Sequence, residues 1–431
     1  MNRGSGESRG GVNLPALRGY NEALLLDLLR GAGPAGLGRA ELAARTGLTP
    51  QAVSKITARL GVDGLIAEAG RAASTGGKPR TLLQLVPDAR HAVGVHLDRD
   101  ELRAVRVDLA GRVVAESSGP LEFGAGPEAA VEAVVRAVRR VADPAGLQLV
   151  GVGVAAPGPL DHRAGAMGRV TGYPSWKGFP LRGVLEGRLG LPVLLDKDTN
   201  AGAAAAAGAW LRVAWPDADA DADAGAGAGV GAGAGVGAGA GAGVGVGVGA
   251  GAGAGVGVGV GAHAGVGRGA DVGPAVDPYV GGGSPTCVYV HVGTGIGAGL
   301  WLGGGVYRGA RSAAGEFGHQ VLLLDGPPCR CGARGCMEVL CLEAVARGDL
   351  SEAARILGEG AANLVALLDV DRVLLGGRVV AAAPEVFVAG VGAVLAARAL
   401  DPARPVVALA GAGVAEGAAE LALAPLFGRA G

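Results

Sequence analysis

A histidine and three cysteines crowd into one short segment, "GEFGHQVLLLDGPPCRCGARGCME", at residues 315–338. The whole chain of 431 residues has only five cysteines and six histidines. The four side chains are ligands that suit a closed tetrahedral zinc site: His319, Cys329, Cys331 and Cys336. A site of this kind leaves no position for water, so we expect a structural zinc ion. The alternative is a set of buried cysteines beside a hydrogen-bonded histidine.

A two-residue repeat of glycine with alanine or valine occupies about residues 215–283. Its uncharged run has the length of a membrane span, but half of its residues are glycine, which is costly in a helix and adds little apolar surface. We expect a disordered, linker-like insertion, and silk-like strand pairing is the alternative. The N-terminus shows no apolar signal segment, and clustered cysteines fit a reducing compartment, so a cytoplasmic protein is expected.

The first 90 residues hold 12 arginines and lysines against 7 acidic residues, on a chain whose net charge is −1. Residues 14–30 have apolar positions at helical spacing. A short helix at 39–46, a glycine turn, and a second helix capped by Thr49 with Pro50 in its first turn then predict a helix-turn-helix. Residues 65–86 predict a hairpin, the wing of a winged helix. A small helical bundle without a DNA role is the alternative.

In a winged helix the second helix enters the major groove, so its exposed side chains are the candidate DNA contacts. Gln51 and Ser54 are placed to reach base edges, and Lys55 and Arg59 to meet phosphates. At the wing, Lys78 and Arg80 suit a backbone or minor-groove contact.

From about residue 89 onward, strands alternate with helices, which predicts an α/β body. Active sites of open α/β sheets lie at the carboxyl ends of strands, so Asp198 in "DKDTN" is a candidate base or ligand contact. Capping of the following alanine-rich helix is its alternative role. A glycine-rich turn, "VGTGIGAG", has backbone amides that suit an anion. Glu316 and Glu338 flank the histidine and cysteine segment and can accept hydrogen bonds from hydroxyl-rich ligands.

Together, the winged helix and the motifs "GVGVAAPGPLD", "DKDTNAGA", "GTGIGAGL", "GEFGH", "CRCGARGCME" and "VLLGG" resemble the ROK family of repressors, open reading frames and sugar kinases. The resemblance implies a winged helix-turn-helix at residues 1–88 and a two-lobed actin-like (ribonuclease H-like) body at residues 89–431. It implies that Asp198 sits where the kinases have their catalytic base. It also implies that Glu316, His319 and Glu338 hold sugar hydroxyls, and that His319 and the three cysteines bind zinc.

Departures from the family pattern bear on catalysis and on the ligand. Family kinases open the body with a turn like Asp-x-Gly-Gly-Thr, which handles ATP phosphate and magnesium. In this chain His96 replaces the aspartate, and the charged residues 98–100 replace the small ones. Bulky carboxylates there repel phosphate, so we expect no phosphoryl transfer. Gly172 and Lys197 stand where sugar-binding members usually carry asparagine.

The sequence therefore predicts a sugar-responsive transcription factor, a repressor acting on sugar metabolism genes. Its expected partners are a double-stranded DNA operator and a sugar effector, in a homodimer or homotetramer away from membranes. The alternative is an ATP-dependent sugar kinase with an added DNA-binding domain.

Overall fold

The computed structural model describes residues 14–71, 80–142, 147–213, 286–399 and 405–429. All of these belong to one compact unit of the chain, and the second unit, residues 218–275, lies outside the described residues. The insertion predicted at about residues 215–283, and Lys78 at the tip of the predicted wing, also lie outside them.

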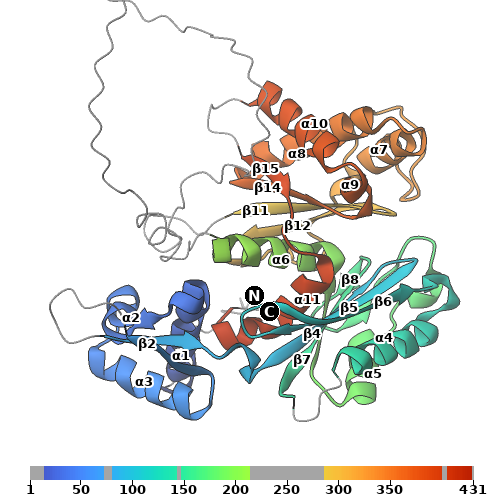
Figure 1. Cartoon of the computed structure of the whole chain (residues 1–431). Coiled ribbons are helices and arrows are strands. Elements are labelled where there is room, and N and C mark those ends of the chain that lie inside the picture. Colours follow the sequence, from blue (N-terminus) through green and yellow to red (C-terminus); the bar gives the residue numbers. More distant parts are fainter. Residues whose placement is uncertain (1–13, 72–79, 143–146, 214–285, 400–404, 430–431) are drawn as a thin grey trace, which may run out of the picture. The chain divides into compact units, whose positions relative to one another are not determined.

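The N-terminal region has the element order of a winged helix-turn-helix (blue in Figure 1). A very short strand, β1 (Leu37–Gly38), pairs with the third strand of a small antiparallel sheet whose order is β1-β3-β2. The other elements of this region are α1 (Leu14–Ala32), α2 (Arg39–Thr46), α3 (Pro50–Val62), β2 (Ile66–Arg71) and β3 (Thr81–Leu85).

The turn between α2 and α3 forms where the sequence predicts it. Gly47 ends α2 with a φ of 68°, a left-handed conformation that glycine adopts without steric cost. Thr49 caps α3, because its Oγ1 accepts a hydrogen bond of 3.2 Å from the backbone N–H of Ala52. Pro50 at the first helical position needs no acceptor for a backbone donor, so the start of α3 is fixed locally.

Two five-stranded sheets with the same topology form the body. Their orders are β10-β7-β4-β5-β6 and β13-β12-β11-β14-β15, and in each sheet the three strands that come first along the chain (β4 to β6, and β11 to β13) pair antiparallel. The next strand along the chain, β7 or β14, lies parallel beside β4 or β11. The last strand, β10 or β15, lies parallel beside β7 or β14. The strands are β4 (His91–Leu97), β5 (Glu101–Asp108), β6 (Val113–Pro120), β7 (Leu149–Ala156), β10 (Val193–Lys197), β11 (Cys287–Val292), β12 (Ile296–Leu302), β13 (Gly305–Val306), β14 (Arg372–Gly376) and β15 (Val406–Leu409).

Each sheet has its own helices on one face, and we call the two halves lobe 1 and lobe 2. Alternate residues of a strand face opposite sides, so Val288 and Val290 of β11 pack among the lobe 2 helices, whereas Cys287 and Tyr289 face α6. The two-lobed α/β prediction is confirmed. Lobe 1 has α4 (Pro127–Val141), α5 (Leu181–Leu189) and the hairpin β8 (Leu160–Asp161) and β9 (Ala166–Met167); lobe 2 has α7 (Met337–Ala346), α8 (Leu350–Leu368), α9 (Arg378–Ala382) and α10 (Pro384–Arg398).

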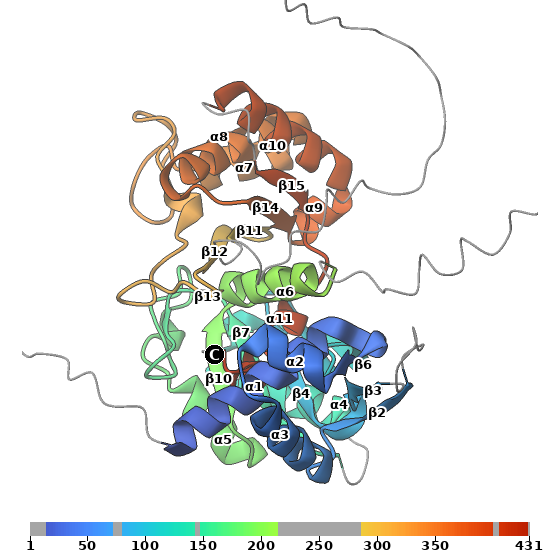
Figure 2. The same cartoon turned by 90° about the vertical axis from the view of Figure 1, so that its left-hand side faces the viewer.

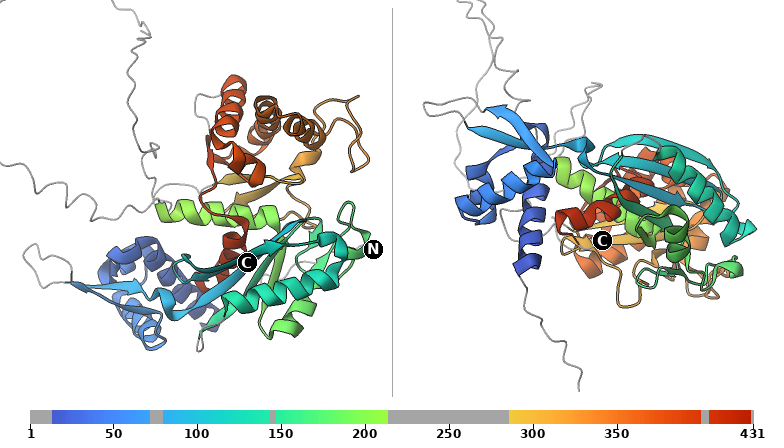
Figure 3. Two further views of the ribbon diagram at one scale, coloured as in Figure 1. Left: turned by 45° about the vertical axis from the view of Figure 1, so that its right-hand side comes forward. Right: turned by 90° about the horizontal axis from the view of Figure 1, so that it is seen from below.

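Two helices, α6 (Asp198–Val213) and α11 (Val414–Leu423), lie between the sheets (green and red helices in Figures 1 and 3). Each follows the last strand of one lobe and packs on the sheet of the other: α6 on β11 and β12, α11 on β4 and β7. Their backbones approach closely, since a Cβ on Gly417 would lie only 1.7 Å from the carbonyl oxygen of Ala201. The alanine-rich sequence of α6 is therefore explained by this crossing.

The N-terminal region shares its hydrophobic core with lobe 1 and α11. Leu29 of α1 and Val53 of α3 belong to one buried cluster with Val105 of β5 and Leu423 of α11. Figure 2 shows α1 and α3 in front of the strands of lobe 1. The division into domains at residues 88 and 89 stays a prediction.

Candidate functional site

A cavity of about 430 Å³ lies between the lobes, and all four predicted sugar contacts line it: Asp198, Glu316, His319 and Glu338. Lobe 1 contributes the carboxyl end of β10, and lobe 2 contributes the glycine-rich turn between β11 and β12. The carboxyl ends of parallel strands meet at one edge of a sheet, so ligands bind there. The structure thus gathers residues that are far apart in the sequence around one pocket.

Asp198 is the first residue of α6 and directly follows β10. Its Oδ1 accepts a hydrogen bond of 2.6 Å from the backbone N–H of Thr199, so it also satisfies a donor of the first helical turn. One oxygen of Asp198 thus helps to start the helix, and the residue also lines the cavity; its contact with a ligand stays a prediction.

Lys197 is a site residue whose importance the sequence signalled only as a departure from the family pattern. Its side chain is only 4% exposed, and Nζ donates to Glu316 Oε1 at 3.1 Å and to the carbonyl of Ala314 at 2.5 Å. A buried ammonium needs such partners. Lys197 therefore neutralises Glu316 and fixes it against lobe 1, which leaves less of this carboxylate for a ligand.

Glu338 and the glycine-rich turn are joined on the lobe 2 side. Glu338, near the start of α7, accepts a hydrogen bond of 2.8 Å through Oε2 from the backbone N–H of Ile296. Gly295 leaves room for this contact, because a Cβ there would lie 3.0 Å from the same oxygen. The turn thus orients a carboxylate, and its amides are not all free for an anion.

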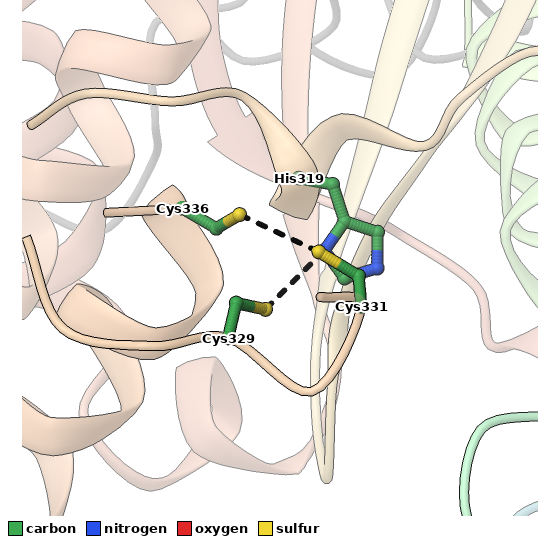
Figure 4. Close-up of side chains that lie close together, drawn as sticks. All are labelled: His319, Cys329, Cys331 and Cys336. Atoms are coloured by element: carbon green, nitrogen blue, oxygen red, sulfur yellow. Dashed lines mark hydrogen bonds between the residues drawn. The ribbon is translucent and has the colours of Figure 1, made fainter. Parts of the chain in front are cut away.

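The four predicted metal ligands come together (Figure 4). Their ligand atoms all lie within 4.8 Å of one another: His319, Cys329, Cys331 and Cys336. Sγ of Cys331 lies 3.7 Å from Sγ of Cys336, and Nδ1 of His319 lies 3.7 Å from Sγ of Cys329. Zinc–sulfur bonds of about 2.3 Å in a tetrahedron separate sulfurs by about 3.8 Å, so the cluster fits a closed metal site. Nε2 of His319 is the ring nitrogen then left to donate into the cavity.

The loop at residues 98–100, which the resemblance places at the family's phosphate turn, contacts lobe 2. Arg99 Nη1 donates to Thr294 Oγ1 of lobe 2 at 3.0 Å, and Arg378 Nη1 of lobe 2 pairs with Asp100 Oδ2 at 2.5 Å. These charged side chains bridge the two lobes. The absence of phosphoryl transfer stays a prediction.

His96, near the end of β4, is half-buried. Burial lowers the pKa of His96 below its usual value, and the carboxylate of Asp198 opposes this shift. Its Nε2 is buried and has no hydrogen-bond partner within the described parts of the chain. His96 is consequently neutral near pH 7, and it provides no carboxylate for magnesium, unlike the aspartate usual in the kinases.

The predicted DNA contacts lie on one exposed face of α3: Gln51, Ser54, Lys55 and Arg59. The opposite side of this helix is buried through Val53, Ile56 and Leu60. Arg59 also forms an ion pair with Glu22 of α1, which the sequence did not indicate. Arg80 is exposed at the start of the second wing strand.

Several cross-lobe contacts were not foreseen from the sequence. Arg308 pairs with Asp196, both almost fully buried, and His162 Nδ1 lies 2.6 Å from Ser312 Oγ. The segment that contains Arg308 and Ser312 lies between β13 and the metal cluster. The only sequence signal for the Arg308–Asp196 pair was the aspartate at the end of a strand, because its arginine partner is remote in sequence.

Known proteins resemble the chain in the segment that carries these motifs. A sequence profile described as ROK family matches residues 280–348, which include Glu316, Glu338 and the metal cluster. In this segment the chain therefore resembles the ROK family. The chain is 22% identical over 328 residues to a xylose repressor of Bacillus spizizenii, covering 75% of the chain and 66% of that repressor.

Two shorter matches add to this picture. A putative xylose repressor of a Caldicellulosiruptor species is 25% identical over 169 residues, 38% of this chain and 42% of the relative. The transcriptional dual regulator NagC of Escherichia coli is 36% identical over 111 residues, 25% of this chain and 26% of its own length. The match therefore spans less than half the length of either regulator.

Solved ROK structures share the fold. A ROK family transcriptional regulator, described as a homolog of E. coli MLC protein, aligns with a TM-score of 0.64 at 17% identity and covers 95% of this chain and 97% of its own. A ROK glucokinase from Streptomyces griseus, solved with glucose and AMPPNP, gives a TM-score of 0.52 at 22% identity, over 77% and 98%. The actin-like fold is thus confirmed. Among the described helices, none has the length and apolar character to span a membrane.

Proposed function

We propose that this protein is a sugar-responsive transcriptional repressor of the cytoplasm, which binds operator DNA through α3 and the wing as a homodimer or homotetramer. The observation that carries the proposal is the pairing of two features in one chain. One is an exposed polar face on α3, and the other is a cleft lined by the four predicted sugar contacts, where charged side chains of the loop at residues 98–100 bridge the lobes.

A sugar is the effector class that the cavity chemistry supports. Carboxylates accept hydrogen bonds from hydroxyl groups, and a metal-bound imidazole donates one, so a polyol is satisfied on several sides. Relatives named xylose repressor and N-acetylglucosamine repressor make D-xylose and N-acetylglucosamine the first candidates. The metal at the histidine and cysteine cluster is proposed to be structural zinc, since three thiolates and one imidazole leave no open position.

Direct DNA binding tests the proposal. Purified full-length protein is titrated into duplex DNA from upstream of its own gene, with and without D-xylose, N-acetylglucosamine and glucose, at several salt concentrations. We expect binding that weakens as salt rises, because phosphate contacts release counterions, and that changes with one of the sugars. Absence of binding at low salt contradicts the proposal.

The kinase alternative is tested with the same sample. ADP release in the presence of ATP, magnesium and each sugar is expected to equal that of a no-enzyme control. Sugar-dependent turnover that disappears in Asp198→Asn would instead establish the kinase.

A further inference from the structure

Helix α11 contacts both lobes and the N-terminal region. On lobe 1, its backbone lies against the glycines of β4 and β7, and a Cβ on Gly153 would lie 1.8 Å from the carbonyl oxygen of Ala418. It crosses α6 at Gly417, and α6 covers the lobe 2 sheet. Backbones in direct contact leave no side chains to absorb a displacement, so a rotation between the lobes must shift α11 or α6.

A buried ion pair joins α11 to α1 of the predicted DNA-binding domain. Arg30 Nη1 donates to Glu420 Oε2 at 2.9 Å and Nη2 to Oε1 at 2.6 Å, with the two side chains 5% and 9% exposed. The Arg30 guanidinium also lies over the ring of Phe427, 4.5 Å from its centre. A bidentate contact fixes the relative orientation of the two helices as well as their distance. We therefore expect α1 to move together with α11 as one rigid unit.

The same helix is clamped one turn earlier. Glu416 of α11 accepts two hydrogen bonds, both 2.7 Å, from Arg103 of β5. Strand β5 begins directly after the loop at residues 98–100, whose Arg99 and Asp100 touch lobe 2. A continuous series of contacts therefore runs from the loop at residues 98–100 along β5, through Arg103 and Glu416, to the ion pair between α11 and α1.

Lobe 2 also lies directly beside the Arg30–Glu420 pair. A cavity of about 20 Å³ beside the ion pair is lined by Arg30 and Glu420 together with Ala204 of α6 and Trp301 of β12. Arg30 and Glu420 thus border β12 of the lobe 2 sheet, and a shift of lobe 2 changes the space around these two side chains.

We propose that the Arg30–Glu420 pair is the joint through which sugar binding in the cleft changes the affinity of the winged helix for DNA. This inference rests on the proposed function and names its transmission element. The pair holds α1 in register with α11. Without it, the winged helix still binds DNA, and the cleft still binds sugar, but the two events are no longer coupled.

The experiment compares three proteins in full-length, metal-loaded form. In the double variant Arg30→Met/Glu420→Leu, apolar side chains of similar length replace the buried pair and keep the site packed, which proteins often tolerate. The matched control is Glu132→Gln, which breaks a two-pronged pair with Arg188 on the surface of lobe 1, away from α11. DNA affinity is measured on labelled upstream duplex with and without D-xylose, N-acetylglucosamine and glucose, and sugar affinity by calorimetry.

We expect a sugar to change the DNA dissociation constant of the wild type and of Glu132→Gln by about tenfold, and that of the double variant by less than about twofold. Sugar affinity and sugar-free DNA affinity stay within about threefold in all three. A double variant that binds the sugar and responds like the wild type overturns the joint alone. A wild type that binds DNA but responds to none of the sugars overturns the proposed function, and the joint with it. If the double variant does not fold, the conservative Arg30→Lys, which keeps the charge but loses the two-pronged contact, is expected to show a reduced response, and a full response refutes the joint.

Discussion

Arg308 of lobe 2 donates through Nε at 2.8 Å and Nη2 at 2.7 Å to Oδ2 of Asp196, the last-but-one residue of β10 in lobe 1. The arginine side chain is 10% exposed and the aspartate 2%. The other aspartate oxygen accepts a hydrogen bond of 2.7 Å from Asn200. A buried carboxylate needs such a cation and such hydrogen bonds, so this pair holds the lobes together beside the cavity.

Replacing Arg308 is expected to destabilise the protein strongly. Arg308→Met leaves a buried aspartate without its cation, which costs about 3 kcal/mol of unfolding free energy. Urea denaturation followed by tryptophan fluorescence measures the loss. Arg188→Met, which breaks an exposed pair with Glu132, is the control and should change stability little. Equal effects of the two variants contradict the role given to Asp196 and Arg308.

Metal content should depend on the cluster and not on cysteine in general. Cys331→Ser is expected to lose most of its zinc, from about one ion per chain, and to melt at a lower temperature. Cys341→Ser serves as the control, because burial raises the pKa of Cys341 to about 12 and its thiol donates to the carbonyl of Ala353. Elemental analysis with and without a chelator decides, and zinc retained by Cys331→Ser would disprove the site.

Asp198→Asn should weaken sugar binding by about tenfold, since a hydrogen bond to a charged acceptor contributes about 1.5–3 kcal/mol. DNA binding without sugar should be unchanged, because Asp198 lies in the cleft. Calorimetric titration with the sugar that regulates DNA binding is the measurement. The control Glu352→Gln removes a carboxylate paired with Arg355 on α8, outside the cavity. A tenfold loss in that control instead would point to an indirect effect.

Acid should destabilise the protein through His96. Its folded-state pKa lies below the unfolded value, so the unfolded chain binds more protons, and stability is full above about pH 6.5 and falls as the pH drops. His91 and His162 have pKa values lowered by burial in the same direction. We expect His96→Gln to make unfolding free energy less dependent on pH between about 7 and 5. Urea midpoints across this range measure it, and an unchanged slope would exclude His96.

The α3 face makes a prediction about salt. Lys55→Ala should weaken binding to all DNA sequences alike and lower the slope of log affinity against log salt by about one, as loss of one phosphate contact requires. Lys177→Ala, an exposed lysine of lobe 1, should leave the slope unchanged. Fluorescence anisotropy at four salt concentrations is sufficient, and identical slopes for both variants would remove Lys55 from the interface.

The local features of the fold could be predicted from sequence, and its long-range pairings could not. Thr49 and Pro50 by themselves indicate the start of a helix, and the cysteine spacing indicates the metal cluster. Helix α11, in contrast, is an alanine-rich segment with no clear periodic pattern, and the sequence suggested only a strand before it. Glu420 lies 390 residues from Arg30, so nothing near either residue indicates the pair. Pairs between residues so far apart in sequence are set by the tertiary fold and not by the local sequence.

The exchange of α6 and α11 between the lobes has a consequence for chain integrity. The segment at residues 214–285 connects α6, which is packed on the lobe 2 sheet, to β11 of that same sheet. A single proteolytic cut within that segment would divide the chain into two fragments, each of which keeps a helix buried against the other. The fragments would therefore stay interlocked as a nicked complex and unfold together, since neither sheet is covered on both faces without the other fragment's helix.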